Sequence, residues 1–355
     1  MKKWLMLGLV VVPVTAMAEV TMYGLLKGGI DYKQTKRNGE KNGSTTNVRD
    51  YISRIGFRGE ENLGEGLKAI WQVEQSVSLT GNTNTGWSNR ETFIGLRGDF
   101  GTIRMGTLRS YFDSDMRNSD PRDYDSVIDW AGGLKMYNRH TVRFGSSIRY
   151  DSPKFSGFEG SVQYVLSDSE NKEVAGQNEP NNEDKAKYVL GLKYTNAALY
   201  AKYALIYDNN GYREGKALKA AQIHRIETGY NDGAVLVGLG YEFGKGVAPY
   251  GVDTQFADQG WDGTQAVTSQ QVVLTGSYKM GNFTPVLSYA HGFKEKNTGT
   301  GVRLNDSKYD QVVATGTYDL SKRTAALMGV GWIKFGPQDD KTQQTAFTMG
   351  LRHLF

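Results

Sequence analysis

The sequence predicts an all-β fold, specifically an antiparallel transmembrane β-barrel of sixteen strands, and three observations lead to this prediction. Many segments alternate polar and apolar side chains with a period of two, as from Thr141 to Asp151, which is the period of a β-strand. The gaps between these segments alternate between short and long. No helix-length apolar run follows the N-terminal segment, and hydrophobic residues make up only 39% of the chain. An apolar-out, polar-in ribbon that turns back tightly at one end is typical of a barrel in a lipid bilayer.

Residues 1–18 have the features of a cleaved secretory signal peptide. Lys2 and Lys3 supply a positive start, an apolar run from Trp4 to Val14 follows, and small residues end the segment at Ala18. The apolar run is about eleven residues long, whereas a membrane-spanning helix needs ~20. We therefore expect export and one mature domain, residues 19–355.

Composition and charge exclude several classes of protein. The chain has no cysteine, which removes disulfides and thiol chemistry. Without Lys2 and Lys3 it carries 40 basic and 38 acidic residues, so nucleic acid is not an expected partner. No nucleophile–base–orienter set is recognisable around the four histidines, so we expect no enzymatic activity, cofactor or metal.

The predicted strands, with ends defined to about 2–4 residues, cover 20–33, 48–59, 66–79, 89–98, 101–110, 141–152, 158–168, 186–195, 197–208, 221–231, 234–244, 269–280, 283–293, 308–320, 323–336 and 345–355.

The connections divide into two kinds. Compact links contain turn residues such as Asn-Asp-Gly at 231–233 and Gly-Asn at 281–282, which adopt the positive φ of tight hairpins. Long polar segments cover 34–47, 80–88, 111–140, 169–185, 209–220, 245–268, 294–307 and 337–344. This alternation predicts short turns on the periplasmic side and long loops outside.

Individual strands show the expected two faces. In the third strand Leu67, Ala69, Trp71 and Val73 alternate with Lys68, Ile70, Gln72 and Glu74. In the segment from Thr141 to Asp151, the apolar face would be Val142, Phe144, Ser146, Ile148 and Tyr150. A backbone in lipid must satisfy its hydrogen bonds internally, so a closed sheet is expected.

Several sequence blocks resemble the general porins of Gram-negative outer membranes, most closely the neisserial-type major porin branch. The blocks are Val20–Gly24, Ser53–Glu60, Gly66–Gln75, Asn89-Arg90 with Phe93–Leu96, Arg149–Pro153, Ser288–Phe293, Tyr309–Val313 and Gly350–Phe355. The terminal Phe355 also resembles the signal that is read by barrel-assembly machinery. The resemblance covers essentially all of the mature chain.

The resemblance implies a trimeric, water-filled channel whose third external loop folds into the lumen. That loop would run from about residue 111 to 140. Its acids are Asp113, Asp115, Asp120, Asp123, Asp125 and Asp129, of which the first three are preferred for the constriction. Expected partners are two further copies of the chain, outer-membrane lipids including lipopolysaccharide, the barrel-assembly machinery, and small hydrophilic solutes and ions.

A basic wall is expected opposite this loop. The alternation of side chains between the two faces of each strand places eight basic residues in the lumen: Lys27, Arg54, Arg58, Lys68, Arg90, Arg104, Arg143 and Arg149. The resemblance carries the role of pore arginine to Arg54 and Arg90, and Arg143 is the next choice. Opposed charges across a narrow aqueous gap favour polar solutes, and the basic wall predicts a mild anion preference.

Two other kinds of barrel remain as alternatives: a solute-specific channel and a plugged barrel that acts as an adhesin. Arg97-Gly-Asp99 lies at a predicted turn, so it does not favour the adhesin. No dense lysine cluster or aromatic ladder is recognisable in the lumen positions, and this favours general diffusion.

Overall fold

The computed structural model describes residues 19–81, 88–120, 133–140, 142–166, 186–214, 217–249, 266–304, 307–336 and 341–355. The signal peptide predicted at 1–18 and the loop acids Asp123, Asp125 and Asp129 lie outside these ranges. In the described part of the chain, no helix has the length and apolarity needed to cross a membrane.

One antiparallel sheet contains eighteen strand segments. They are β1 (Glu19–Arg37), β2 (Glu40–Asp50), β3 (Arg54–Gly64), β4 (Leu67–Ser76), β5 (Thr92–Gly98), β6 (Gly101–Arg109), β7 (Arg143–Asp151), β8 (Phe158–Val165), β9 (Lys187–Asn196), β10 (Leu199–Glu214), β11 (Ala217–Asn231), β12 (Val235–Val247), β13 (Val267–Tyr278), β14 (Phe283–Gly292), β15 (Lys296–Asn297), β16 (Tyr309–Asp319), β17 (Thr324–Phe335) and β18 (Thr342–Leu354). Two short helices, α1 (Tyr111–Ser114) and α2 (Lys135–Asn138), lie between β6 and β7.

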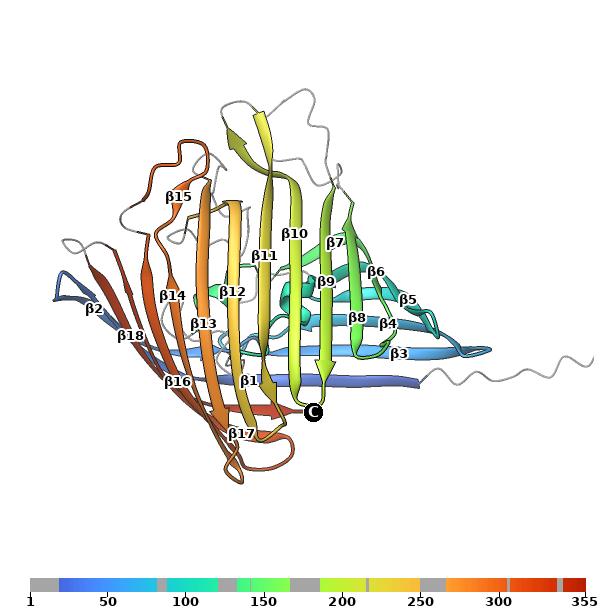
Figure 1. The fold of residues 1–355 in the computed structure, drawn as a ribbon. Helices are drawn as coiled ribbons and strands as arrows, with labels where there is room; N and C mark the ends of the chain where they lie inside the picture. The colour runs from blue at the N-terminus through green and yellow to red at the C-terminus, as the bar shows by residue number, and fades with distance from the viewer. Residues whose placement is uncertain are drawn as a thin grey trace, which may run out of the picture.

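The sheet closes on itself, because β1 pairs with β18 from Leu25↔Leu354 to Arg37↔Thr342. β2 and β3 both pair with β1 and act as one interrupted barrel strand. β14 and β15 share β13 in the same way. The eighteen segments therefore make a closed sixteen-stranded antiparallel barrel (Figure 1), which confirms the predicted fold class.

Two predicted external loops are strand instead. At 34–47, β1 continues to Arg37 and β2 begins at Glu40. Asn38 and Gly39 join them with φ of 52° and 89°, the positive φ pair of a type I′ hairpin. At 209–220, β10 continues to Glu214 and β11 begins at Ala217. These segments are polar because they rise beyond the apolar band, and cross-strand backbone hydrogen bonds keep them extended.

Short connections gather at one end of the barrel. They include Glu65-Gly66, Asp99-Phe100 and Ala197-Ala198, and the C-terminus lies at this end too (Figure 1). The connections at the opposite end are mostly longer, as between β6 and β7 and between β12 and β13. The predicted alternation of turns and loops is therefore present.

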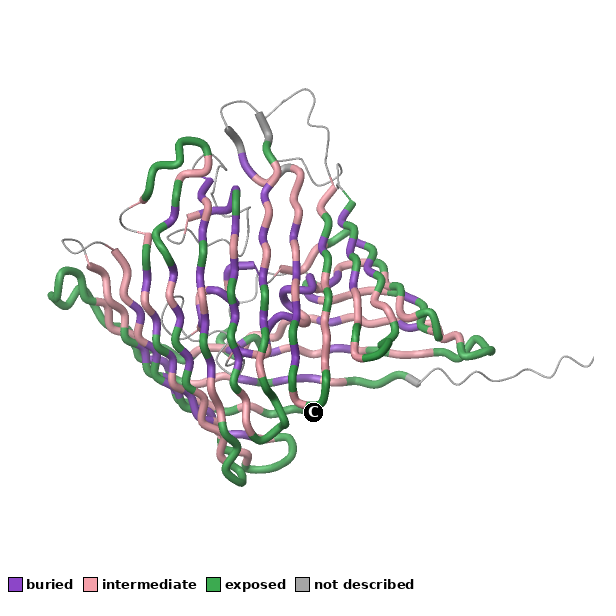
Figure 2. The backbone as a smooth tube through the Cα atoms, in the orientation of Figure 1, coloured by how far each residue is buried: buried purple, intermediate pink, exposed green. Residues whose placement is uncertain are grey.

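Burial alternates along the strands, as the purple and green bands of Figure 2 show. In β13, Val273 is fully buried while its neighbour Leu274 is 52% exposed. In β9, Val189 is buried while Leu190 and Leu192 are exposed. The outer surface thus presents the apolar side chains that a lipid bilayer covers.

The face predicted for Phe144 is wrong. Its ring packs against a buried cluster inside the barrel, whereas Ile148 and Tyr150 are exposed as expected. The register between β6 and β7 shifts at Gly106/Leu108, and Ser146 has φ of 45°. A bulge inserts an extra residue in one strand and so turns Phe144 to the other face. Arg143, the first residue of β7, still reaches Asp113 inside the barrel at 3.7 Å.

A buried polar group inside the barrel joins the two ends of the chain. The Tyr51 hydroxyl donates to Asp31 Oδ1, and Thr348 Oγ1 donates to the same oxygen at 2.7 Å. Asp31 lies on β1 and Thr348 on β18, so this contact bridges the closure of the barrel.

We expect Tyr51→Phe to weaken the closure, because a buried carboxylate loses one donor at a cost of about 1–3 kcal/mol. Thermal unfolding of the folded barrel, followed by its shifted electrophoretic mobility, measures this loss. Tyr241→Phe, on the exposed face of β12, is the matched control. Equal thermal shifts for the two variants would remove Tyr51 from the closure.

Candidate functional site

The connection between β6 and β7 enters the barrel. Figure 1 shows α1, in teal, within the ring of strands. Phe112 and Met116 are fully buried and pack on inner-wall residues of β9 to β13, namely Val189, Ala204, Ile206, Ile223, Val247 and Val267. Leu134, Met136 and Tyr137 pack on the inner wall of β13 to β18. We call residues 110–120 and 133–140 together the inner segment.

Individual residues shape the inner segment and make room for it on the barrel wall. Ser110 caps α1 by accepting a hydrogen bond from the Asp113 N–H at 3.3 Å. Gly191 on β9 leaves room for Tyr111, since a Cβ at this position would lie 2.3 Å from the ring. Gly240 on β12 likewise makes room for Met136 and Tyr137.

Arg225 on β11 connects the two described halves of the inner segment. Its guanidinium donates to the Met136 carbonyl at 2.6 Å and to the Met116 carbonyl at 3.4 Å. It also donates from Nε to Glu242 Oε2 at 2.9 Å, and it lies over the Tyr137 ring at 5.2 Å from the centroid. The side chain is fully buried, so its charge is balanced entirely by these contacts.

Further polar contacts fix the segment to the wall. Glu227 on β11 accepts hydrogen bonds from the Ser119 N–H at 2.8 Å and from the Tyr137 hydroxyl at 2.9 Å. Gln311 on β16 donates to the Gly133 carbonyl at 2.7 Å. The bonds to the Ser119 N–H and the Gly133 carbonyl satisfy backbone groups of the segment that would otherwise be buried and unpaired.

Four arginines face the inner segment from the other side. Arg90 Nε lies 2.5 Å and Arg54 Nε 3.4 Å from the carboxylate of Glu74 on β4. Arg109 and Arg143, the other two, contact Asp113 on α1, with N–O distances of 2.8 and 3.7 Å. We call these four residues the arginine cluster: Arg54, Arg90, Arg109 and Arg143.

The arginine cluster carries more positive charge than its partners neutralise. Four guanidinium groups share the carboxylates Glu74 and Asp113, and Arg117 of the inner segment also contacts Asp113 at 3.4 Å. A third carboxylate, Glu91, accepts a 3.4 Å hydrogen bond from the Arg109 backbone N–H and is shared with Arg104. The side chains of Arg54, Arg109 and Arg143 are each about 30% exposed. The surplus charge therefore reaches the water in the barrel.

The pKa of Asp113 shows how strongly the neighbouring arginines act on its carboxylate. Burial alone would raise it, but Arg109, Arg143 and Arg117 outweigh burial and hold the pKa at about 2. Asp113 therefore stays ionised in any ordinary solution and binds the inner segment to the cluster.

Three other basic residues predicted in the lumen, Arg104, Arg149 and Lys27, lie outside the arginine cluster. Arg104 and Arg149 share Asp151, at 2.6 and 2.8 Å, and Arg149 also reaches Asp115 at 3.0 Å. Lys27 is buried on β1.

Arg58 and Lys68 do not join the arginine cluster. Arg58 lies over the Tyr23 ring, 5.3 Å from the centroid, and Lys68 pairs with Glu60 at 2.5 Å beside the β3–β4 turn. Of the preferred loop acids, Asp113 meets the cluster, whereas Asp115 pairs with Arg149 and Asp120 accepts a 2.7 Å hydrogen bond from Arg117.

Sequence reasoning missed Arg109, Glu74, Arg117 and Arg225. Arg109 ends a predicted strand next to the acidic loop, so its position was the available signal. Arg225 has lumen parity, but nothing in the local sequence separates it from other inward residues. Within the ranges given above, no three His, Cys, Asp or Glu side chains are arranged to hold a metal ion.

We expect Arg225→Met to destabilise the barrel by about 3–5 kcal/mol, because the buried carboxylate of Glu242 loses its guanidinium partner, and the 2.6 Å hydrogen bond from Gln271 does not replace that charge. Thermal unfolding measures the loss. The double variant Arg225→Met/Glu242→Gln should recover part of it, since the unpaired charge is then gone. A double variant that is less stable than the single one would contradict this account.

Acid should weaken the contact between Asp113 and the cluster only at very low pH. The lowered pKa means that ionised Asp113 stabilises the fold fully above its ordinary pKa of ~3.9, and that this contribution is lost as pH falls through about 2. The stability difference between the wild type and Asp113→Asn should therefore be constant from pH 7 to about 4.5 and shrink towards pH 2. Thermal unfolding over this pH range tests it, and a difference that vanishes near pH 5 would contradict it.

Comparisons with known proteins agree with this geometry. The family model described as Gram-negative porin matches residues 27–355. The major outer membrane protein P.IB of Neisseria sicca is 38% identical over 377 residues, with 100% of both chains covered.

Two solved structures share the fold. The anion-selective porin from Comamonas acidovorans has a TM-score of 0.69 at 22% identity, covering 95% of this chain and 100% of that one. The trimer form of the outer membrane protein OmpT of Vibrio cholerae has a TM-score of 0.63 at 12% identity, covering 95% and 99%. The chain belongs to the Gram-negative porin family and is a channel protein of the outer membrane.

Proposed function

We propose that this porin is a general diffusion channel with a mild preference for anions, and that the arginine cluster and the inner segment form its narrowest part. The observation that carries the proposal is the surplus of guanidinium groups over carboxylates at a place where three arginine side chains reach water. The anion selectivity named for the Comamonas porin also supports a preference for anions over cations in this channel.

The two sides of the lumen differ in charge, and this difference explains selection. At ~4 Å and an effective dielectric near 20, a pair of unit charges interacts by about 4 kcal/mol. Acids on the inner segment facing arginines on β3 to β7 therefore impose a field across the water. Polar solutes align with that field, whereas apolar solutes would have to displace ordered water.

Several features of the mature channel belong to the same proposal. Residues 1–18 would be removed on export, and three copies would assemble, as in the trimer form of OmpT. Phe355 would be read by the assembly machinery. Its backbone pairs with Gly24 on β1 by hydrogen bonds of 2.9 and 3.1 Å, and its ring covers the glycine. Lipids of the outer membrane, lipopolysaccharide among them, would surround the apolar wall.

Charge reversal in the cluster tests the proposal. We expect Arg54→Glu to lower the anion-to-cation permeability ratio roughly three- to tenfold, because a surplus positive charge becomes negative at the narrow zone. Reversal potentials in planar bilayers under a salt gradient measure this ratio.

Arg58→Glu is the matched control, since it reverses the same charge on the same strand outside the cluster. If both variants changed the ratio equally, the arginine cluster would not be the selective zone. A wild-type barrel that passes no current would instead support the plugged alternative, and block by one solute would support a specific channel.

A further inference from the structure

The connection that follows β14 contacts the inner segment. Its residues 293–304, which we call the outer hairpin, lie at the loop end of the barrel around β15 (Figure 1). Within it Glu295 is fully buried, and its Oε1 accepts a hydrogen bond from the Arg139 guanidinium at 3.3 Å. Arg139 belongs to the inner segment, so the outer hairpin is joined directly to the loop that lies inside the barrel.

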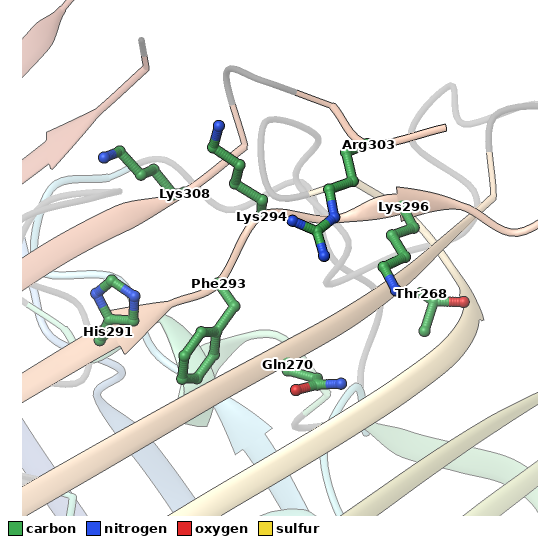
Figure 3. A pocket seen from close by; sticks show the side chains of 8 residues that line it. All are labelled: Thr268, Gln270, His291, Phe293, Lys294, Lys296, Arg303 and Lys308. Atoms are coloured by element: carbon green, nitrogen blue, oxygen red, sulfur yellow. The ribbon is translucent and has the colours of Figure 1, made fainter. Parts of the chain in front are cut away.

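The neighbours of Glu295 show which way its side chain points. Lys294 and Lys296 are both exposed, and Figure 3 shows their side chains on the wall of a surface pocket. Successive side chains of an extended chain project to opposite sides. Glu295 accordingly points away from that surface, and none of its side chain is exposed.

Local hydrogen bonds fix the backbone of Glu295 in the outer hairpin. Its N–H donates to the Ser307 hydroxyl oxygen at 2.7 Å, and its carbonyl accepts from the Leu304 N–H at 2.9 Å. The Ser307 hydroxyl in turn donates to the Leu304 carbonyl at 2.7 Å. The carboxylate of Glu295 is therefore held in place by the hairpin and moves with it.

The outer hairpin makes a second contact inside the barrel. Leu304 packs against the buried apolar cluster that contains Phe112 and Met116 of the inner segment. Glu295 meets the other described half of the segment, at Arg139. The hairpin is thus placed to act on both described halves of the inner segment.

The charges around Arg139 make its contact with Glu295 important. The Arg139 guanidinium also donates to the Ala248 carbonyl, and the neighbouring His140 lies 3.6 Å from Glu242, the partner of Arg225. Burial lowers the pKa of His140 to about 3, so His140 is neutral. In these contacts two buried guanidinium groups face two buried carboxylates, and loss of Glu295 would leave an excess of buried positive charge.

We propose that Glu295 is a positioning residue of the channel, which binds Arg139 and so couples the outer hairpin to the inner segment. A load applied to the hairpin from outside therefore changes the conductance. The inference rests on the proposed function, in which the inner segment narrows the lumen, and it adds control of that segment from the loop end of the barrel.

Single-channel recording in planar bilayers tests the inference on the full mature channel. We expect Glu295→Gln to raise the fraction of time in partly closed states roughly tenfold or more, because residues 133–140 lose their tie to the hairpin and move into the lumen. Glu295→Asp keeps the charge and should reverse part of this effect.

Asp310→Asn is the matched control. It removes the same charge from β16 close to the outer hairpin, but Asp310 pairs with His291 and with the exposed Tyr289 rather than with the inner segment. Its recordings should equal those of the wild type. Equal closure by Asp310→Asn and Glu295→Gln, or wild-type recordings from Glu295→Gln, would overturn the proposal.

The double variant Arg139→Gln/Glu295→Gln removes both charges of the pair. It should close less often than Glu295→Gln, because the excess buried charge is gone. This comparison also covers the case in which Glu295→Gln does not fold, since the double variant should then fold and conduct. A double variant that closes as often as the single one, or that also fails to fold, would contradict the charge argument.

A label on the outer hairpin tests the coupling itself. The chain has no cysteine, so Val302→Cys, at a position that is 62% exposed, can be modified alone with a maleimide polymer. The label should make closures more frequent when Glu295 is present and add nothing in the Glu295→Gln background. Lys41→Cys, exposed on the β1–β2 hairpin, is the control site. Equal effects of the label at both sites, or with and without Glu295, would contradict the coupling.

Arg54→Glu separates this inference from the proposed function. If the Glu295 variants record like the wild type while Arg54→Glu still shifts the permeability ratio, the coupling is wrong and the proposed function stands. If Arg54→Glu leaves the ratio unchanged, the proposed selective zone is wrong instead.

Discussion

Backbone hydrogen bonding across the β1–β18 junction is the constraint on which the rest of the structure depends. In lipid no water is present to satisfy peptide groups, so a sheet edge is not tolerated. Thirteen cross-strand residue pairs from Leu25↔Leu354 to Arg37↔Thr342 remove that edge. Closure creates an inside and an outside from one sheet, and every functional feature of this porin lies on one of those two surfaces.

The inner surface is itself divided. From β9 to β18 it carries buried apolar residues, which would be costly to leave in contact with channel water. The inner segment covers them with Phe112, Met116, Leu134 and Met136. From β3 to β7 the surface carries the arginine cluster, of which Arg54, Arg109 and Arg143 reach water. Buried apolar residues and hydrogen-bonding partners such as Arg225, Glu227 and Gln311 on the β9 to β18 side explain why the segment folds inward and which side it takes.

Arg225 and Asp113 hold this arrangement in two ways. Arg225 binds backbone carbonyls from both halves of the segment and is wholly buried, so it fixes position. Asp113 joins the segment to the arginines and therefore sets the separation between the opposed charges. The same contacts that hold the segment thus also define the electrostatics of the lumen.

The sequence by itself determined the barrel, because side-chain alternation and turn chemistry are local properties of the chain. It predicted sixteen strands, the inward loop through the family resemblance, and Arg54, Arg90 and Arg143, which the structure brings together. The long loop predicted between Gln34 and Asn47 is wrong, because strands β1 and β2 meet there in a hairpin, for which Asn38-Gly39 was a local signal. Only the tertiary structure decided that Arg109 joins the cluster while Arg58 and Lys68 do not, that a bulge turns Phe144 inward, and that Arg225 binds the inner segment. The physical reason is that height in the barrel and distance across the lumen depend on strand register and bulges, and parity along one strand specifies neither.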